Sequence, residues 1–235
     1  MTFTRLDGRK PDELRELDAK VGIIPRADGS AMFKMGKTIA IAAVYGPKEL
    51  YPKFLQDSTK GVLRCSYSMM AFSGSGGERV RPGPSRRSKE ISWVTENALN
   101  SALDLSKYAK SVINVNIQLL QTDAGTRCAG ICAAALALAD AGIPMRDMVG
   151  AVAVGLYEGH PIVDLTKEEE DVEGAVDLAV AMLSRSKKLS LVQMDGKIEQ
   201  ETMKKVLKLA EGAIDKIYVV QKKALLEKYG GSGNE

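Results

Sequence analysis

The chain has 235 residues, of which 45% are hydrophobic, so it carries enough apolar side chains for a substantial folded core, and wholesale disorder is excluded. No apolar run approaches the roughly 20 residues that cross a bilayer. The polar start MTFTRLDGRKPDELRE is unlike a signal peptide, so we expect a cytoplasmic protein with no membrane contact. The formal net charge is +3, but basic side chains gather in residues 79–89 and acidic ones in residues 164–177, a separation that suits an anionic ligand and a divalent cation meeting in one site.

The first part of the chain is predicted to form strands, then a loop and a helix. Short apolar runs with turn residues between them predict a β-meander at residues 19–45 and a further strand at residues 62–72. Residues 74–85 are rich in Gly and Pro and predict a loop. A helix is expected to begin near Ser85–Ser88, because apolar residues then recur at steps of three and four, at Ile91, Val94, Ala98 and Ala102.

The second part mixes strands and helices. Residues 111–120 alternate apolar and polar side chains, which is typical of a half-buried strand. The Ala- and Gly-rich residues 126–142 predict a helix packed closely against a sheet and ended by Gly142 and Pro144. Four more apolar runs with turn-type breaks follow, and the last helix is expected at residues 201–228. The four runs are residues 151–157, 161–165, 175–183 and 188–196.

The order of these elements favours an α+β fold. Strands come first, strands and helices then mix, and the sequence has neither a regular βαβ alternation nor a tandem repeat. We therefore expect a single α+β domain over residues 1–229, rather than a doubly wound sheet, followed by a flexible tail at residues 230–235.

Cysteine and histidine offer little for catalysis. There are three cysteines and no CxxC pair, which argues against a disulfide framework and a zinc site. Cys128 and Cys132 lie four residues apart, as expected of small packing residues on one helix face. His160, the single histidine, lies in YEGHP, a predicted turn. Any chemistry is therefore expected from carboxylates, arginines, lysines, backbone amides or a metal held by oxygen ligands.

The segment DAGTR, residues 123–127, is a candidate phosphate-binding turn. It joins a predicted strand to a predicted helix, where free backbone N–H groups meet the positive end of the helix dipole. Gly125 lets an anion approach the backbone, Thr126 offers a hydroxyl, and Arg127 has a planar guanidinium suited to phosphate. An ordinary helix cap with a surface arginine explains the same residues equally well.

The acidic segment EEEDVEGAVD places Asp171 and Asp177 six residues apart, on either side of Gly174. Asp177 alternates with apolar residues of a predicted strand and has small neighbours that leave room for a ligand. Two converging carboxylates suit Mg²⁺, and one of them can serve as a general acid. A solvated acidic loop before a strand is the simpler interpretation, and the pattern alone favours it.

Arginines cluster in RPGPSRRSKE. Pro82 and Pro84 stiffen the loop that carries Arg81, while Arg86 and Arg87 lie at the start of the predicted helix. A rigid loop bearing arginines suits the backbone of a polyanion, although a solvated basic loop is an equally good interpretation.

On the preceding strand, Arg64 can add a phosphate contact and Tyr67 a ring for base stacking, although a tyrosine in such a strand more often packs in the core. Taken together, the motifs supply a phosphate-binding turn, a carboxylate pair for a metal and a basic channel. Phosphorolysis of a nucleic acid needs this set of groups.

Several segments, read together, resemble the RNase PH superfamily, and within it the catalytic ring subunit of archaeal exosomes. The resemblance runs from about Arg5 to Tyr229 and is strongest in the block from DAGTR to ADAGIPMRD and in the aspartate pair. The other segments that carry it are LDGRKPDELRE, RADGSAMFKMGKT, AVYGPKE, LRCSYSM, RPGPSRRSKEIS and LVQMDGKI.

The resemblance implies an RNase PH-type α+β domain and a reaction in which inorganic phosphate removes nucleotides from an RNA 3′ end as nucleoside diphosphates. It assigns the phosphate and RNA motifs to residues 5–150 and the aspartates and final helix to residues 151–229. Mg²⁺ or Mn²⁺ would be the cofactor. The implied site residues are Asp171 and Asp177 for catalysis and metal, Gly125, Thr126, Arg127 and Arg87 for phosphate, and Arg64, Tyr67, Arg81 and Arg86 for RNA.

The implied partners are single-stranded RNA, a paralogous non-catalytic RNase PH-like subunit in a hexameric ring (a trimer of heterodimers), and RNA-binding cap subunits. Two departures stand out, since Ser66 occupies a position where relatives usually carry arginine and residues 172–176 differ from the usual loop before the second aspartate. The alternatives are a non-catalytic, RNA-binding ring subunit, against which the retained Asp171, Asp177 and Arg127 argue, and a stand-alone RNase PH that trims tRNA.

Overall fold

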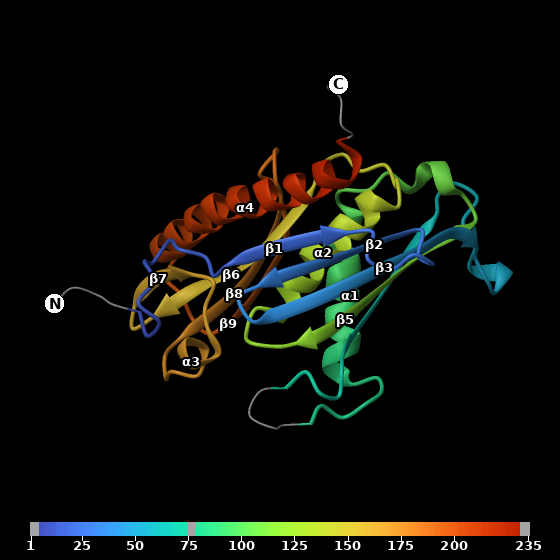
Figure 1. Ribbon diagram of the computed structural model, residues 1–235. Helices are drawn as coiled ribbons and strands as arrows, with labels where there is room; N and C mark the ends of the chain where they lie inside the picture. The colour runs from blue at the N-terminus through green and yellow to red at the C-terminus, as the bar shows by residue number, and fades with distance from the viewer. Residues whose placement is uncertain (1–4, 75–78, 231–235) are drawn as a thin grey trace, which may run out of the picture.

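The computed structural model describes residues 5–74 and 79–230 (Figure 1). The predicted tail at residues 230–235 lies outside the described residues apart from Gly230. Two β-sheets and their covering helices share one hydrophobic core, which confirms the α+β class. No helix in the described ranges is long and apolar enough to cross a membrane.

The first sheet has five strands in the order β1-β2-β3-β5-β4. Its first four members pair antiparallel, whereas β4 runs parallel to β5. The alternation predicted for residues 111–120 is present in β5, where Val115, Ile117 and Leu119 are fully buried. The strands are β1 (Leu17–Val21), β2 (Gly29–Met35), β3 (Thr38–Glu49), β4 (Val62–Met69) and β5 (Ser111–Gln121).

The second sheet is antiparallel, with the order β7-β6-β8-β9. Its strands correspond to the four apolar runs predicted from the sequence, and no boundary differs by more than two residues. They are β6 (Val149–Tyr157), β7 (His160–Val163), β8 (Val176–Leu183) and β9 (Leu189–Asp195).

The helices separate and cover the two sheets (Figure 1). Adjacent residues of a strand point to opposite faces of the sheet. In β6, the backbone amide of Ala151 donates to the Cys132 thiol of α2, whereas a side chain at Gly150 would meet Ile214 of α4, and both helices pack on this strand. The second sheet therefore lies between α2 and α4. The helices are α1 (Arg86–Asn100), α2 (Thr126–Asp140), α3 (Lys167–Glu170) and α4 (Gln200–Tyr229), and two short 3₁₀ turns span Lys53–Leu55 and Leu105–Tyr108.

Small residues let α2 occupy the centre of the molecule. Almost all of its side chains are buried, and it contacts strands of both sheets. Cys128 and Cys132 are among these buried residues, which confirms their predicted packing role. Because α2 touches both sheets, its N-terminus is held at a fixed place between them.

The start of α1 agrees with the prediction, and the end of β4 differs slightly from it. Ser85 is the N-cap, and its hydroxyl accepts a hydrogen bond of 3.0 Å from the Ser88 amide while the Ser88 hydroxyl accepts one of 2.8 Å from the Ser85 amide. The strand expected to reach residue 72 ends at Met69, because residues 71 and 72 form a turn.

The close pairing of β6 and β8 generates a prediction. A Cβ atom on Gly155 would lie 1.7 Å from the carbonyl oxygen of Val176 on the neighbouring strand. Gly155→Ala must push the two strands apart, so we expect the free energy of unfolding in a urea titration to fall by about 3 kcal/mol.

Gly212 in α4 is the matched control, because nothing lies within 4 Å of a Cβ built there. Gly212→Ala should leave the fold intact and raise stability by about 1 kcal/mol, since alanine favours a helix over glycine. Equal stability of the two variants would contradict the described strand pairing.

Candidate active site

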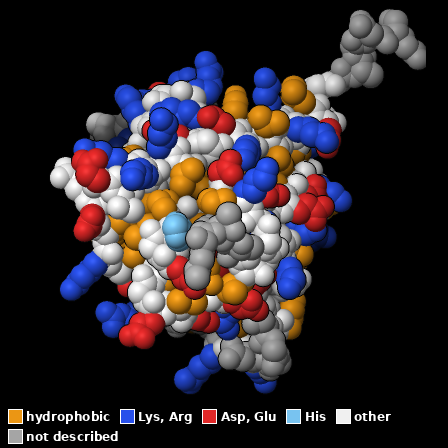
Figure 2. Space-filling view, turned by 90° about the vertical axis from the view of Figure 1, so that its left-hand side faces the viewer, with side chains coloured by type: hydrophobic (Ala, Val, Ile, Leu, Met, Phe, Trp, Pro, Cys, Tyr) orange, Lys and Arg blue, Asp and Glu red, His pale blue; other side chains and the backbone are white. Residues whose placement is uncertain are grey.

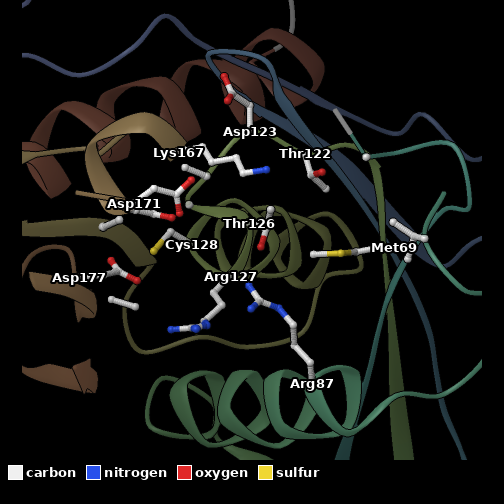
Figure 3. A pocket seen from close by; sticks show the side chains of 17 residues that line it. Met69, Arg87, Thr122, Asp123, Thr126, Arg127, Cys128, Lys167, Asp171 and Asp177 are labelled. Carbon is white, nitrogen blue, oxygen red and sulfur yellow. The ribbon is translucent and has the colours of Figure 1, made fainter. Parts of the chain in front are cut away.

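A hollow of about 390 Å³ opens at the N-terminus of α2, between the ends of both sheets (Figure 3). Its walls come from the β5–α2 turn, the start of α1, the end of β4, the helix α3 and the strand β8. Six residues singled out from the sequence line it together: Arg87, Gly125, Thr126, Arg127, Asp171 and Asp177.

One side of the hollow is built to receive an anion. Gly125 is the N-cap of α2 with φ = 61°, and among the described residues no side chain caps the amides of the first turn. These N–H groups lie at the positive end of the helix dipole. Arg127 and Arg87 extend into the same space from α2 and α1 (Figure 3). The turn therefore combines open amide donors with two guanidinium groups, as phosphate requires.

The backbone of the turn is held from below by two side chains. Ala124 has φ = 54°, an unusual value for a residue with a side chain. The hydroxyl of Thr38 lies 2.9 Å and 2.8 Å from the carbonyl oxygens of Asp123 and Ala124 and accepts the Asp123 amide. Arg15 donates to the carbonyl oxygen of Asp123 as well. The left-handed turn is thus fixed before any ligand arrives.

Arg15 also ties the turn to the opposite wall through the buried Asp164. One guanidinium nitrogen lies 2.7 Å from Asp164 Oδ1, another lies 3.0 Å from Oδ2, and the Arg15 amide donates to Oδ2 at 2.8 Å. Arg9 approaches the same carboxylate at 3.5 Å. Asp164 follows β7 directly, so this pair joins the N-terminal segment, residues 5–16, to the second sheet.

A second buried pair positions α3. Arg5 donates to both carboxylate oxygens of Glu169, at 2.8 Å and 2.7 Å, and both side chains are fully shielded from solvent. Glu169 in turn accepts the Thr166 amide at 2.9 Å as part of a capping box. Asp171 is the C-cap residue of α3, so the buried pair fixes the backbone that carries this carboxylate.

The acidic wall faces the arginines. Asp177 projects from β8, and its Oδ1 atom is buried without a hydrogen-bond partner. Burial raises the pKa of Asp177 and the nearby Asp195 carboxylate adds to the effect, while Arg127 and Arg87 oppose it. Asp171 is exposed at the mouth of the hollow. In Figure 3 the two aspartates lie on the same side, across from Arg127 and Arg87.

The carboxylates fit a magnesium or manganese ion that also binds phosphate oxygens. Mg²⁺ is commonly held by one or two carboxylates, with water and substrate phosphates completing its shell. The unpartnered oxygen of Asp177 supplies such a ligand beside Asp171. Within the described ranges no cluster of three or more acidic, His or Cys side chains forms a closed metal cage, so substrate and water would complete the coordination.

The other residues predicted for RNA occupy different places. Arg81 lines a small adjoining hollow with Arg87, whereas Arg64 and Arg86 are exposed outside these hollows. The expectation of an open stacking ring at Tyr67 is not met. Its side chain is 3% exposed and packs against α2 near Gly130, because the absence of a side chain there lets the ring lie in the core.

Four residues in or below the hollow escaped the sequence analysis as individual site residues. Lys167 and Glu170 of α3 line it, and Lys167 extends into it in Figure 3. Arg15 and Asp164 act from below. The signal for the α3 residues was the acidic run itself, which follows Lys167 directly and contains Glu170, but nothing local distinguishes Arg15 within LDGRKPDELRE.

The remaining candidates for nucleophilic chemistry lie elsewhere or are shielded. His160 is exposed at the start of β7, on the face of the molecule in Figure 2, and does not line the hollow. Cys128 does line it, but burial raises the pKa of its thiol well above the ordinary value. The arrangement therefore favours binding and polarising a phosphate group over forming a covalent intermediate on a cysteine or histidine.

Glu170 gives the site a testable pH dependence. Burial raises its pKa to about 7, with Asp177 adding to the shift. A carboxyl group whose pKa is higher in the folded chain destabilises the fold where it is ionised. In metal-free protein the penalty is absent below the ordinary pKa of 4.5, grows as pH rises to about 7 and is complete above that.

We therefore expect Glu170→Gln to raise the free energy of unfolding above pH 7 and to leave it unchanged below about pH 4. Urea titrations across this range measure the difference. Glu168→Gln, an exposed change in the same helix, should keep the parent profile. Parallel profiles for the parent and Glu170→Gln would contradict the burial of this carboxyl.

Comparisons with known proteins identify the family of the chain. The two domain models of the 3′ exoribonuclease family match residues 13–144 and 147–213. The chain is 47% identical to the exosome complex component Rrp41 of Methanopyrus kandleri, covering 97% of this chain and 94% of that protein. It is 49% identical to Rrp41 of Pyrococcus furiosus, covering 96% and 89%.

Among solved structures, the crystal structure of rice (Oryza sativa) Rrp46 superimposes with a TM-score of 0.82 at 25% identity, covering 94% of this chain and all of that one. The two family models together cover most of the chain. The relatives and the solved structure, which match over most of their own length, agree with this assignment. The protein belongs to the 3′ exoribonuclease family, with the RNase PH fold.

Proposed function

We propose that this chain is a phosphate-dependent 3′→5′ exoribonuclease, which uses inorganic phosphate to release nucleoside diphosphates from RNA. The observation that carries the proposal is the opposition, in one hollow, of a phosphate-binding turn with two arginines to a pair of carboxylates. A hydrolytic nuclease needs a place for water, whereas this site has a preformed place for a second anion beside the scissile phosphodiester.

In the proposed reaction, phosphate lies on the turn at Gly125–Arg127, held by the amides of α2 and by Arg127. One of its oxygens forms a bond to the phosphorus of the terminal nucleotide. The bond from that phosphorus to the preceding 3′ oxygen breaks, and this oxygen leaves with a proton as a new 3′ hydroxyl. Arg87 extends into the hollow (Figure 3), where it would face the transferring group, so positioning and fixed charge would supply most of the catalysis.

The leaving oxygen needs a proton, and the acidic wall can provide one. Burial raises the pKa of Glu170 to about 7, so this carboxyl can carry a proton near neutral pH, and burial shifts the pKa of Asp177 in the same direction. A bound Mg²⁺ or Mn²⁺ would be held by Asp171 and Asp177 and would neutralise charge on the phosphate oxygens. The retained carboxylates and Arg127 argue against a non-catalytic ring subunit.

The relatives point to the setting of the reaction. Two relatives that match this chain over nearly its whole length are named exosome complex components. We extend this to the present chain, as the catalytic subunit of a cytoplasmic, hexameric exosome ring in which it alternates with a paralogous RNase PH-like subunit. This ring would carry RNA-binding caps and degrade single-stranded RNA. A stand-alone homohexamer is the alternative, and the mass of the assembly formed with and without the paralogue separates the two.

The edges of the sheets support a protein partner of the same type. On β4, the outward amides of Cys65 and Tyr67 are already bonded to Glu96 and Ser92 of α1. The outer edge of β9 is unpaired within the described residues, and Leu189, Val192 and Met194 are 50%, 43% and 45% exposed there. An open apolar edge strand readily pairs with a strand of another chain. In the proposed ring, β9 would pair with a strand of the paralogous subunit.

Two substitutions test the catalytic assignment. Arg127→Ala removes the phosphate contact and Asp177→Asn removes the buried charge, so we expect each to lower kcat/KM by about 100-fold or more. The measurement is phosphate-dependent shortening of a 5′-labelled RNA by the chain assembled with its paralogue, with the diphosphate products separated by chromatography.

Arg185→Ala is the control, since Arg185 is exposed and lies in a separate hollow between α2 and α4. It should retain full activity. Folded Arg127→Ala or Asp177→Asn protein with parental activity would place the reaction elsewhere, and monophosphate products that form without phosphate would refute phosphorolysis.

A further inference from the structure

A continuous groove leads away from the phosphate-binding turn. The hollow of the candidate site shares Met69, Val80 and Arg87 with a small second hollow. The second hollow shares Ser68 and Ser88, among others, with a third hollow of about 510 Å³. The three therefore form one path between β4, the start of α1 and the loop before it, and the path ends beside Trp93.

Trp93 is unusually placed for so large an apolar side chain. The face of α1 that packs in the core carries Ile91, Thr95, Ala98 and Leu99, whereas Trp93 points away from it and is 66% exposed. Tryptophan side chains are highly buried on average, because removing the large apolar ring from water is favourable in free energy. Here the indole lines the groove while most of its surface remains open to solvent or to a ligand.

The groove has the chemistry of a site for a single nucleic-acid strand. Lys89 lines its outer part, and Arg81 and Arg87 line its middle. The exposed Ser66 adds a hydroxyl, while Glu96 is the one carboxylate among the described residues that line the third hollow, and it accepts the Cys65 amide. Strand-binding proteins combine such a cationic track with aromatic rings on which bases stack.

A peptide strand is a poorer fit for this groove. A peptide would bind by adding a strand to the edge of β4, but Ser92 accepts the Tyr67 amide at 2.8 Å and Glu96 accepts the Cys65 amide at 3.4 Å. These bonds occupy the donors that strand addition needs. The groove is thus left to a ligand that binds through phosphates and rings.

We propose that Trp93 is a stacking platform for an unpaired base of the RNA strand, upstream of the 3′-terminal nucleotide in the candidate site. Arg87 and Trp93 lie six residues apart on α1, which corresponds to about 9 Å along the helix axis. The platform therefore acts on a base within a few nucleotides of the reacting end. The identity of the strand as RNA rests on the proposed function, whereas the stacking itself is tested without catalysis.

Trp93 is the single tryptophan of the chain, so its fluorescence reports on this position alone. Titration with a ten-residue oligoadenylate, in buffer without phosphate or divalent cations, should quench the emission saturably. An abasic oligomer with the same backbone length should bind without comparable quenching. The titrations are made on the chain alone and on the assembly with its paralogue.

Trp93→Ala should weaken binding of the fluorescein-labelled oligoadenylate by about 10-fold in anisotropy, and Trp93→Phe should restore most of it. In turnover, the KM for RNA should rise while the KM for phosphate stays the same. Tyr51→Ala, which removes an exposed aromatic ring that does not line the groove, should bind RNA as the parent does.

RNA that binds with parental affinity to Trp93→Ala and leaves the emission of the parent unchanged would overturn the stacking proposal and leave the proposed function standing. An absence of RNA binding by the parent, alone and in the assembly, would overturn both. If Trp93→Ala degrades RNA by phosphorolysis and binds RNA with parental affinity, the stacking proposal fails while the proposed function holds.

Discussion

The ion pair between Arg15 and Asp164 is the contact on which the candidate site depends. Asp164 is fully buried and has φ = 55°, so its carboxylate and its backbone are both unfavourable without compensation. Arg15 supplies two charged contacts and an amide, and the same guanidinium reaches the carbonyl oxygen of Asp123. One arginine thus couples the phosphate-binding turn to the second sheet.

This coupling explains why the site lies at the junction of the two family domains. The first domain, residues 13–144, provides Arg87 and the turn at Gly125–Arg127, and the second provides Asp171 and Asp177. Helix α2 touches both sheets, so its N-terminus brings amide donors and carboxylates to face each other across a short space. Neither domain alone would contain the anion site and the acidic wall.

Local signals made part of this arrangement predictable. The helix start near Ser85, the alternation in β5 and the glycine turn before α2 depend on neighbouring residues, and the structure confirms them. Features set by distant contacts could not be predicted in this way. Arg15 and Asp164 are 149 residues apart, and Tyr67 is buried because α2 carries Gly130 opposite its ring, which no pattern in β4 reveals. Burial set by distant contacts likewise raises the pKa of Asp177 and Glu170, and local sequence does not reveal it.

The central claim is that the anion on the turn is a reactant and forms a bond to the terminal nucleotide. The most direct measurement supplies radiolabelled inorganic phosphate with unlabelled RNA and locates the label after turnover. The account predicts that the label appears in the β-phosphate of the released nucleoside diphosphates, one for each nucleotide removed. RNA shortening with all of the label still in inorganic phosphate would contradict it.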